Sequence, residues 1–287
     1  MPTLKEVKTK ITGVKKTSQI TKAMNMVAAA KLRGAQEKME AFRPYTSKFN
    51  ETMSNLSGGT TADFPLMEVR EVKKVELIVV TSDRGLCGSY NANTVKLVEK
   101  AIKEYEAKGV EVSLVCVGKK GYQTLRRTGK VRKSYLDIMA SFQMFNAREI
   151  ASDVADQFLK GEIDQADIFY GEFKSVVSQV PTSMPFLPVK PVEAEEDAGQ
   201  VSGDYINEPS TEEIMDTLQP LYLNVMVYSA LLECGASEHA ARMTAMDNAT
   251  NACRDIVSNL TIVYNKARQA AVTNELIDIV GGAEALN

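Results

Sequence analysis

The sequence CGASEHAARMTAMDNATNACRDIVSNLTIVYNKARQAAV, residues 234–272, carries a row of mostly small or apolar side chains at alternating spacings of three and four. The alternation extends in both directions, and it is the heptad pattern of a coiled-coil helix. We therefore expect one long helix over residues 210–287 whose contact row faces a partner helix. The row consists of Val225, Tyr228, Leu232, Gly235, His239, Arg242, Met246, Ala249, Cys253, Ile256, Leu260, Val263, Ala267, Ala270, Asn274 and Ile277.

The ends of this predicted helix carry signals of their own. Ser210 and Glu213 have the spacing of a capping box at its start, and Gly281 and Gly282 predict its end. Pro220 predicts a kink or an interruption, because proline lacks a backbone donor and clashes with the preceding turn. A helix of this length would be roughly 100 Å long at about 1.5 Å per residue. It is therefore too long to be buried within its own fold.

A second heptad pattern opens the chain and predicts a helix over residues 1–57. Its apolar positions are Leu4, Val7, Ile11 and Val14, and then Leu32, Ala35, Met39, Phe42, Phe49, Met53 and Leu56. Between them the row is polar or small, at Ser18, Thr21, Asn25 and Ala28. Ile20, Met24 and Val27 form a stripe on another face of the same stretch, which indicates that a second surface encloses the helix there. The alternative is a well-buried turn of an ordinary coiled coil.

The two terminal helices are expected to pair with each other. Because their inner ends join the same central region, the pair must be antiparallel. The C-terminal helix is longer by about 16 residues, so roughly 24 Å of it should extend as a single helix. Residues 270–280 of that tip are apolar or uncharged except for Glu275 and Asp278. An unpaired apolar helix end in water predicts a partner that covers it.

The middle of the chain, residues 58–209, has a different pattern and predicts an α/β domain. Residues 75–81, 112–117, 168–173 and 183–189 are expected to be strands, and residues 91–107, 119–127 and 147–159 helices. This alternation is typical of a largely parallel sheet. Residues 191–208 are acidic and contain glycine, which predicts an exposed loop before the C-terminal helix. The expected fold class is therefore an α/β domain joined to a long antiparallel coiled coil.

Composition excludes several function classes. No apolar run is long enough to span a bilayer, and the cysteines Cys87, Cys116, Cys234 and Cys253 lack the spacing of a zinc site or disulfide framework. We expect them to be reduced and packed. Residues 1–50 hold eleven Lys or Arg against three Glu, whereas residues 191–216 hold nine acids and no base. The two regions are thus expected to face different partners, although a solvated helix face explains the basic charges equally well.

The loop SDRGLCGS, residues 82–89, follows a strand and precedes a helix, where many α/β proteins bind phosphate. It lacks the Lys-Ser/Thr of a P-loop and the glycine spacing of a dinucleotide site. His239 is the only histidine, which excludes a histidine-based triad and a multi-histidine metal site. The carboxylates Asp83, Glu275 and Asp278 have no partner at catalytic spacing. We expect no catalytic residue, cofactor or metal.

Several stretches resemble a known family. They are TSQITKAMNMVAAAKLRGAQ (17–36), SDRGLCGSYNAN (82–93), SEHAARMTAMDNATNA (237–252) and YNKARQAAVTNELIDIVGGAEAL (264–286). At both ends and in the middle, the chain resembles the gamma subunit of bacterial F-type ATP synthases. The resemblance implies a non-catalytic rotor of the central stalk, peripheral on the cytoplasmic face of the plasma membrane. Proton flow would turn a ring of c subunits and this shaft, which drives ATP synthesis in the alpha/beta ring, or hydrolysis in reverse.

The resemblance also implies partners for individual residues, alongside a contact with the epsilon subunit. Contacts with the alpha/beta ring would come from Met24, Arg84, Cys87, Arg242, Arg268, Gln269, Thr273 and Glu275. Met24 and Arg242 would lie in a collar around the shaft, Arg84 and Cys87 near an acidic segment of beta, and the last four in the tip. Tyr205 and Glu208, in DYINEP, would touch the c ring. For each residue, packing between the two helices or plain solvation is the simpler alternative.

Two other functions remain open from the residues alone. The central domain could bind a nucleotide, with the coiled coil as an accessory. The basic N-terminal helix could bind nucleic acid, although it has no interleaved aromatic residues. We expect neither nucleic-acid binding nor direct membrane insertion.

Overall fold

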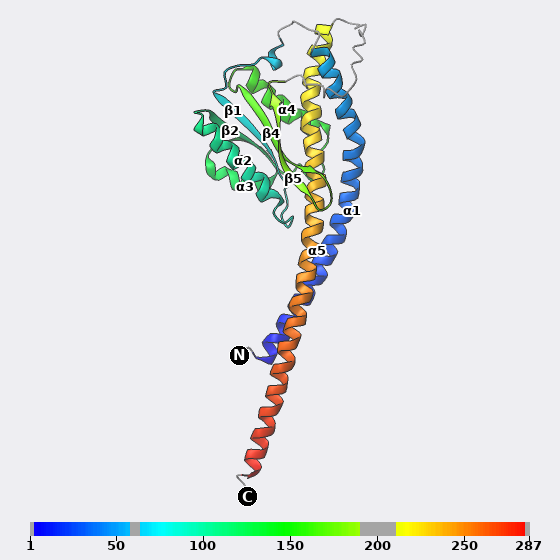
Figure 1. Ribbon diagram of the computed structural model, residues 1–287, viewed down its shortest axis with the longest axis vertical. Coiled ribbons are helices and arrows are strands. Elements are labelled where there is room, and N and C mark those ends of the chain that lie inside the picture. Colours follow the sequence, from blue (N-terminus) through cyan, green and yellow to red (C-terminus); the bar gives the residue numbers. More distant parts are fainter. Residues whose placement is uncertain (1–2, 58–63, 190–210, 285–287) are drawn as a thin grey trace. The chain divides into compact units, whose positions relative to one another are not determined.

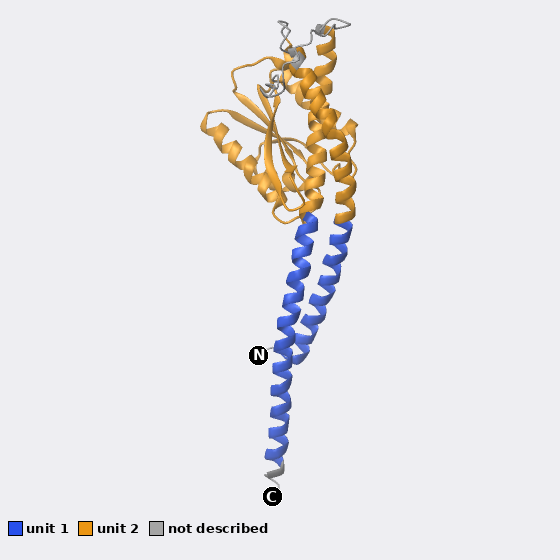
Figure 2. Cartoon of the chain, turned by 45° about the vertical axis from the view of Figure 1, so that its right-hand side comes forward, with its two compact units in different colours: residues 1–28, 242–287 blue, residues 29–241 orange. Residues whose placement is uncertain are grey.

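The computed structural model describes residues 3–57, 64–189 and 211–284 (Figure 1). Two long helices, α1 and α5, lie at the ends of the chain, and a five-stranded sheet with shorter helices lies between them in sequence. The chain forms two compact units, one of residues 1–28 with 242–287 and one of residues 29–241, coloured separately in Figure 2. Each long helix therefore contributes residues to both units.

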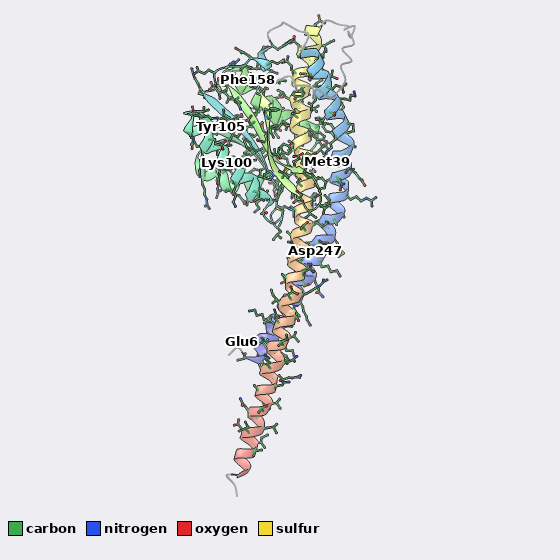
Figure 3. The ribbon with its side chains drawn as sticks, in the orientation of Figure 1. Glu6, Met39, Lys100, Tyr105, Phe158 and Asp247 are labelled. Atoms are coloured by element: carbon green, nitrogen blue, oxygen red, sulfur yellow. The ribbon has the colours of Figure 1, made fainter. Side chains whose placement is uncertain are left out.

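Helix α1 runs from Leu4 to Ser57, as predicted. A capping box begins it: the Thr3 N–H donates to Glu6 Oε2 at 2.9 Å, and the Glu6 N–H donates to Thr3 Oγ1 at 3.3 Å. Figure 3 labels Glu6 in this first turn. The predicted contact row is confirmed, because every one of its positions from Leu4 to Leu56 is buried or half-buried.

Helix α5 runs from Thr211 to Glu284 without a break, so the predicted end at Gly281 and Gly282 was wrong. Of the kink or interruption predicted at Pro220, the interruption does not occur, because the apolar packing of its neighbours Tyr222 and Leu223, 6% and 1% exposed, offsets the lost hydrogen bond. Gly281 and Gly282 do not end it, since glycine weakens a helix by about 1 kcal/mol but only favours termination. Ser210 of the predicted capping box lies outside the described residues.

In the unit of residues 1–28 and 242–287, α1 and α5 form an antiparallel pair. The hydroxyl oxygens of Thr21 and Thr250 are 2.8 Å apart and hydrogen-bonded, and Asn25 Nδ2 donates to the Met243 carbonyl at 2.9 Å. Because the partner number falls as the α1 number rises, the helices run in opposite directions. The polar gap in the N-terminal row is therefore filled by hydrogen bonds between the helices.

The contact row of α5 departs from the prediction in its second half. Its inward positions are the pairs Met246 and Thr250, Cys253 and Val257, Leu260 and Tyr264, and Ala267 and Ala271, whereas the predicted Ile256, Val263 and Ala270 are exposed. In each pair the second inward residue lies four positions after the first, whereas the predicted row placed it three positions after. Thr250 decides this choice, because its hydroxyl contacts Thr21 on the partner helix.

The second unit is built around a sheet of order β3-β2-β1-β4-β5. Strands β1 (Lys74–Val80), β2 (Glu111–Val117), β3 (Val131–Tyr135) and β4 (Gln165–Phe173) are parallel, and β5 (Gln179–Leu187) pairs antiparallel with β4. Helices α2 (Tyr90–Ala107), α3 (Lys119–Leu125) and α4 (Met144–Leu159) connect them, with short 3-10 turns at Pro65–Met67 and Arg126–Thr128. The predicted α/β class and largely parallel sheet are confirmed.

Two apolar layers cover the sheet. Leu77 and Val79 of β1 face one layer with α2 and α3, and Ile78 and Val80 face the other with α4 and α5. Figure 3 labels Met39 of α1, which is 2% exposed, and Phe158 of α4, which is fully buried. Strand β1 is apolar from Val75 to Val80 except for Glu76, because both of its faces are buried.

Strand β3 was not predicted, because its sequence VRKSY is mostly polar. Its position depends on an ion pair: Arg132 Nε and Nη2 donate to the two carboxylate oxygens of Glu76 at 2.6 and 3.0 Å. Glu76 is fully buried in β1, and burying its charge without this partner would cost free energy of folding.

Strand β5 begins at Gln179, four residues before the predicted 183, although it contains Pro181 and Pro185 at the edge of the sheet. The predicted acidic loop, 191–208, lies outside the described residues.

Candidate interaction surfaces

Over residues 3–57, 64–189 and 211–284, no group of three or more His, Cys, Asp or Glu side chains could hold a metal ion. No described helix combines the length and apolarity needed to cross a membrane. The predicted site residues that the structure describes lie on three surfaces, of which the loop of residues 82–89 comes first.

Asp83 anchors one end of this loop. Its Oδ1 accepts hydrogen bonds from the N–H groups of Lys119 and Asp137 at 2.9 and 3.1 Å, and its Oδ2 accepts one from Met139 N–H at 2.9 Å. One carboxylate thus joins the ends of β1, β2 and β3. Asp137 has a left-handed φ of 63°, which this bond helps to hold. The carboxylate without a catalytic partner is therefore a structural group.

The same bonds argue against a nucleotide at this edge of the sheet. Phosphate sites in α/β proteins use free backbone N–H groups at the carboxyl ends of the strands. Here the N–H at the start of α3 is already bonded to Asp83, and the Ser82 N–H donates to Asn91 Oδ1 at 3.1 Å. The protein's own side chains occupy these donors.

Tyr90 anchors the other end of the loop. It begins α2, is 6% exposed, and its hydroxyl donates to Cys234 Sγ on α5 at 3.0 Å. Burial, reinforced by the neighbouring Cys234, raises the pKa of the Tyr90 phenol well above its usual value. Gly171 of β4 makes room for the ring, because a Cβ there would lie 2.3 Å from Tyr90 Cε2. The loop is therefore held at both ends by buried side chains.

Of the two contact residues predicted in this loop, Arg84 is exposed and Cys87 is buried. Cys87 is 3% exposed, and its sulfur accepts a hydrogen bond from Asn91 Nδ2 at 3.1 Å. Leu86, by contrast, is 62% exposed and has a left-handed φ of 62°. A non-glycine residue there costs roughly 1–2 kcal/mol, and such strain concentrates at functional positions. Arg84 is exposed, and Lys120 lies close to Gly85, so the loop presents an apolar side chain among cations.

A second exposed apolar surface lies on α1. Ile20 and Val27 are 60% and 58% exposed, and Met24 between them is half-buried. The predicted stripe on this face is therefore uncovered by the described part of the chain. Arg242, predicted to lie in the same collar, is 9% exposed.

The third surface is the tip of α5. Every residue from 272 to 282 is exposed, which confirms the predicted single-helix tip. Its apolar side chains are 51–69% exposed: Val272, Leu276, Ile277, Ile279 and Val280. The predicted contact residues Arg268, Gln269, Thr273 and Glu275 are all exposed as well. The two predicted c-ring residues, Tyr205 and Glu208, lie outside the described residues.

Sequence reasoning identified Arg84 but missed Leu86 and the neighbouring Lys119 and Lys120. A large apolar residue in a turn between two glycines, Gly85 and Gly88, was the available signal, because such a residue has little to pack against locally. Lys119, which pairs with Asp137 at 2.7 Å, joins the loop only through the folded edge of the sheet.

Comparison with known proteins decides the family. The family profile described as ATP synthase matches residues 3–286. The ATP synthase gamma chain of Desulfotalea psychrophila is 74% identical over 289 residues, covering all of both chains. The chain belongs to the ATP synthase gamma chain family. A gamma chain from Nitratidesulfovibrio vulgaris is 48% identical, covering all of this chain and 99% of its own.

Solved structures agree with this assignment. A chain of the central stalk and c ring of the Tetrahymena thermophila mitochondrial ATP synthase is 30% identical, with a TM-score of 0.61 over 80% of this chain and 99% of its own. A chain of the Euglena gracilis mitochondrial ATP synthase is 21% identical and has the same fold, with a TM-score of 0.72 over 99% of this chain and 94% of its own. This gamma chain is accordingly a central-stalk rotor subunit of an F-type ATP synthase.

Proposed function

We propose that this gamma chain is the non-catalytic rotor that couples proton flow through a c ring to ATP synthesis or hydrolysis in a ring of alpha and beta subunits. The observation that carries the proposal is the α5 tip, a single helix whose apolar side chains are more than half exposed from residue 272 onward. Water is a poor environment for such a surface. Surrounding subunits of the alpha/beta ring would cover the apolar side chains of the tip.

A rotor drives a catalytic site only if it contacts the conformations of that site unequally. The described surfaces have this asymmetry. The stripe of α1 at Ile20, Met24 and Val27 lies on one helix of a pair, and the tip belongs to α5 alone. As such a shaft turns, each catalytic subunit would meet a different face of it.

We assign the contacts as follows. Met24, with Ile20 and Val27 beside it, would meet the collar of the alpha/beta ring, with Arg242 supporting that surface from within the chain. Arg268, Gln269, Thr273 and Glu275 would meet loops of beta around the tip. Tyr205 and Glu208 would touch the c ring, and the epsilon subunit would bind elsewhere on the stalk. The subunit would be peripheral, on the cytoplasmic face of the plasma membrane.

At residues 82–89 we replace the expected contact through Cys87 with one through Leu86. An acidic segment of beta that also carries an apolar residue would match Leu86, Arg84 and Lys120 in both apolarity and charge. Cys87 would support the loop from inside. This assignment explains why a strained, exposed leucine occupies the turn.

Reconstitution with purified alpha and beta subunits tests the rotor. We expect one copy of the chain in the complex, Mg-ATP hydrolysis that depends strongly on its presence, and no hydrolysis by the chain alone. Hydrolysis by the isolated chain, or failure to join the ring, would contradict the proposal.

The loop contact has its own matched pair of variants. Leu86→Asp should slow hydrolysis in the reconstituted complex by about tenfold, because a charge replaces a buried apolar contact. Val69→Asp makes the same change at a residue 78% exposed before β1, at the opposite end of the sheet, and should leave the rate unchanged. Equal rates for both variants would remove Leu86 from the interface.

A further inference from the structure

Three elements of the unit of residues 29–241 meet at one buried carboxylate. Glu233 of α5 is 7% exposed, and its Oε1 accepts hydrogen bonds from Nε and Nη2 of Arg43 on α1 at 3.0 and 2.8 Å. Its Oε2 accepts the backbone N–H of Phe173, the last residue of β4, at 2.9 Å. Arg43 Nη2 also donates to the Phe173 carbonyl at 3.1 Å. Two charged side chains thus close around one residue of the sheet.

The other contacts of α5 with the sheet layer are mainly apolar. Met226, Val227, Ala230 and Leu231 pack in the same layer as the strands and α4. Apolar burial is non-directional, so it resists separation of the two parts more strongly than sliding of one over the other. The guanidinium fork and the carboxylate accept only a narrow range of geometries. A relative rotation of the helices and the sheet would therefore distort these hydrogen bonds, as it would the one from Tyr90 to Cys234.

We infer that Arg43, Glu233 and the Phe173 backbone form a clamp that keeps α1, α5 and the sheet turning as one body. This inference rests on the proposed rotor function. The sheet carries the Leu86 loop, and the helices carry the collar and the tip. If the sheet rotated less than the helices under load, the Leu86 loop would contact beta at a different rotational angle from the collar and the tip. Arg43 and Glu233 are therefore positioning residues, acting through the orientation of the loop.

The clamp is tested in membrane vesicles that hold the complete enzyme, by measuring ATP hydrolysis and ATP-driven proton uptake in the same preparation. Glu233→Gln and Arg43→Gln should lower the proton uptake per ATP hydrolysed by about half or more, because the two parts slip under load. Arg43→Lys keeps the charge but loses the two parallel donors of the guanidinium group. Its proton uptake per ATP hydrolysed should lie between that of these variants and that of the unaltered chain. Asp216→Asn removes a charge from an exposed position of α5 and should change nothing.

The ratio separates the clamp from a purely structural role. A variant that only destabilises the chain lowers the amount of assembled enzyme, and both rates fall together with an unchanged ratio; that result would overturn the clamp. A ratio equal to that of the unaltered chain in Glu233→Gln and Arg43→Gln would do the same. If the unaltered chain itself restores neither hydrolysis nor proton uptake, the rotor proposal fails first.

Discussion

Replacing Asp83 with alanine should destabilise the unit of residues 29–241 by about 2–4 kcal/mol. The carboxylate accepts three backbone hydrogen bonds from the segments that follow β2 and β3. Bonds to a charged acceptor contribute about 1.5–3 kcal/mol each, but water can reach the N–H groups of Lys119 and Asp137 once the carboxylate is gone. Met139 is 5% exposed, so water cannot replace the carboxylate there, and the lost hydrogen bond should cost nearly its whole contribution to stability.

Urea unfolding of the full chain, followed by tyrosine fluorescence, measures this loss, since the chain has ten tyrosines and no tryptophan. Asp83→Asn keeps acceptor oxygen but loses the charge, and should cost about half as much. Asp156→Ala, at an exposed position of α4, is the matched control and should change the free energy of unfolding by less than about 0.5 kcal/mol. An equal loss for Asp83→Ala and Asp156→Ala would refute the anchoring role.

Three further outcomes are expected. Gly171→Ala should destabilise the same unit by about 1–3 kcal/mol, because the new Cβ would lie 2.3 Å from Tyr90 Cε2; unchanged urea unfolding would show that the ring moves freely. Gly34→Ala should instead stabilise the chain by up to about 1 kcal/mol, since nothing lies within 4 Å of its Cβ inside α1. Burial raises the pKa of the Cys116 thiol to about 12, so iodoacetamide at pH 8 should modify Cys116 only after unfolding, as mass spectrometry of the labelled peptide can establish.

Much of the fold follows from local patterns. The heptad rows predicted α1 and α5 and their pairing, because a coiled-coil seam repeats every few residues regardless of what lies elsewhere. The largely apolar run at residues 75–81 predicted the central strand β1 for a similar reason, since burial of both faces favours apolar side chains at nearly every position. The single-helix tip followed from the difference in length between the two helices.

Other features depend on segments that are far apart in the sequence. The inward position at Thr250 is chosen by Thr21, and the polar strand β3 is held by the buried Glu76. No local pattern reports such pairs. From sequence alone, a glutamate in a helix is predicted to be exposed to solvent. At Glu233 the fold instead places Arg43 within hydrogen-bonding distance.

The sequence by itself therefore determined the family and every α-helix and strand except β3, because helix and strand periodicity and long matching stretches are properties of neighbouring residues. Only the tertiary structure decided which side chain of the loop faces outward, Leu86 and not Cys87, because burial depends on what the rest of the chain packs against. It also decided that Asp83 anchors the loop, since its three donors lie 36 to 56 residues away along the chain.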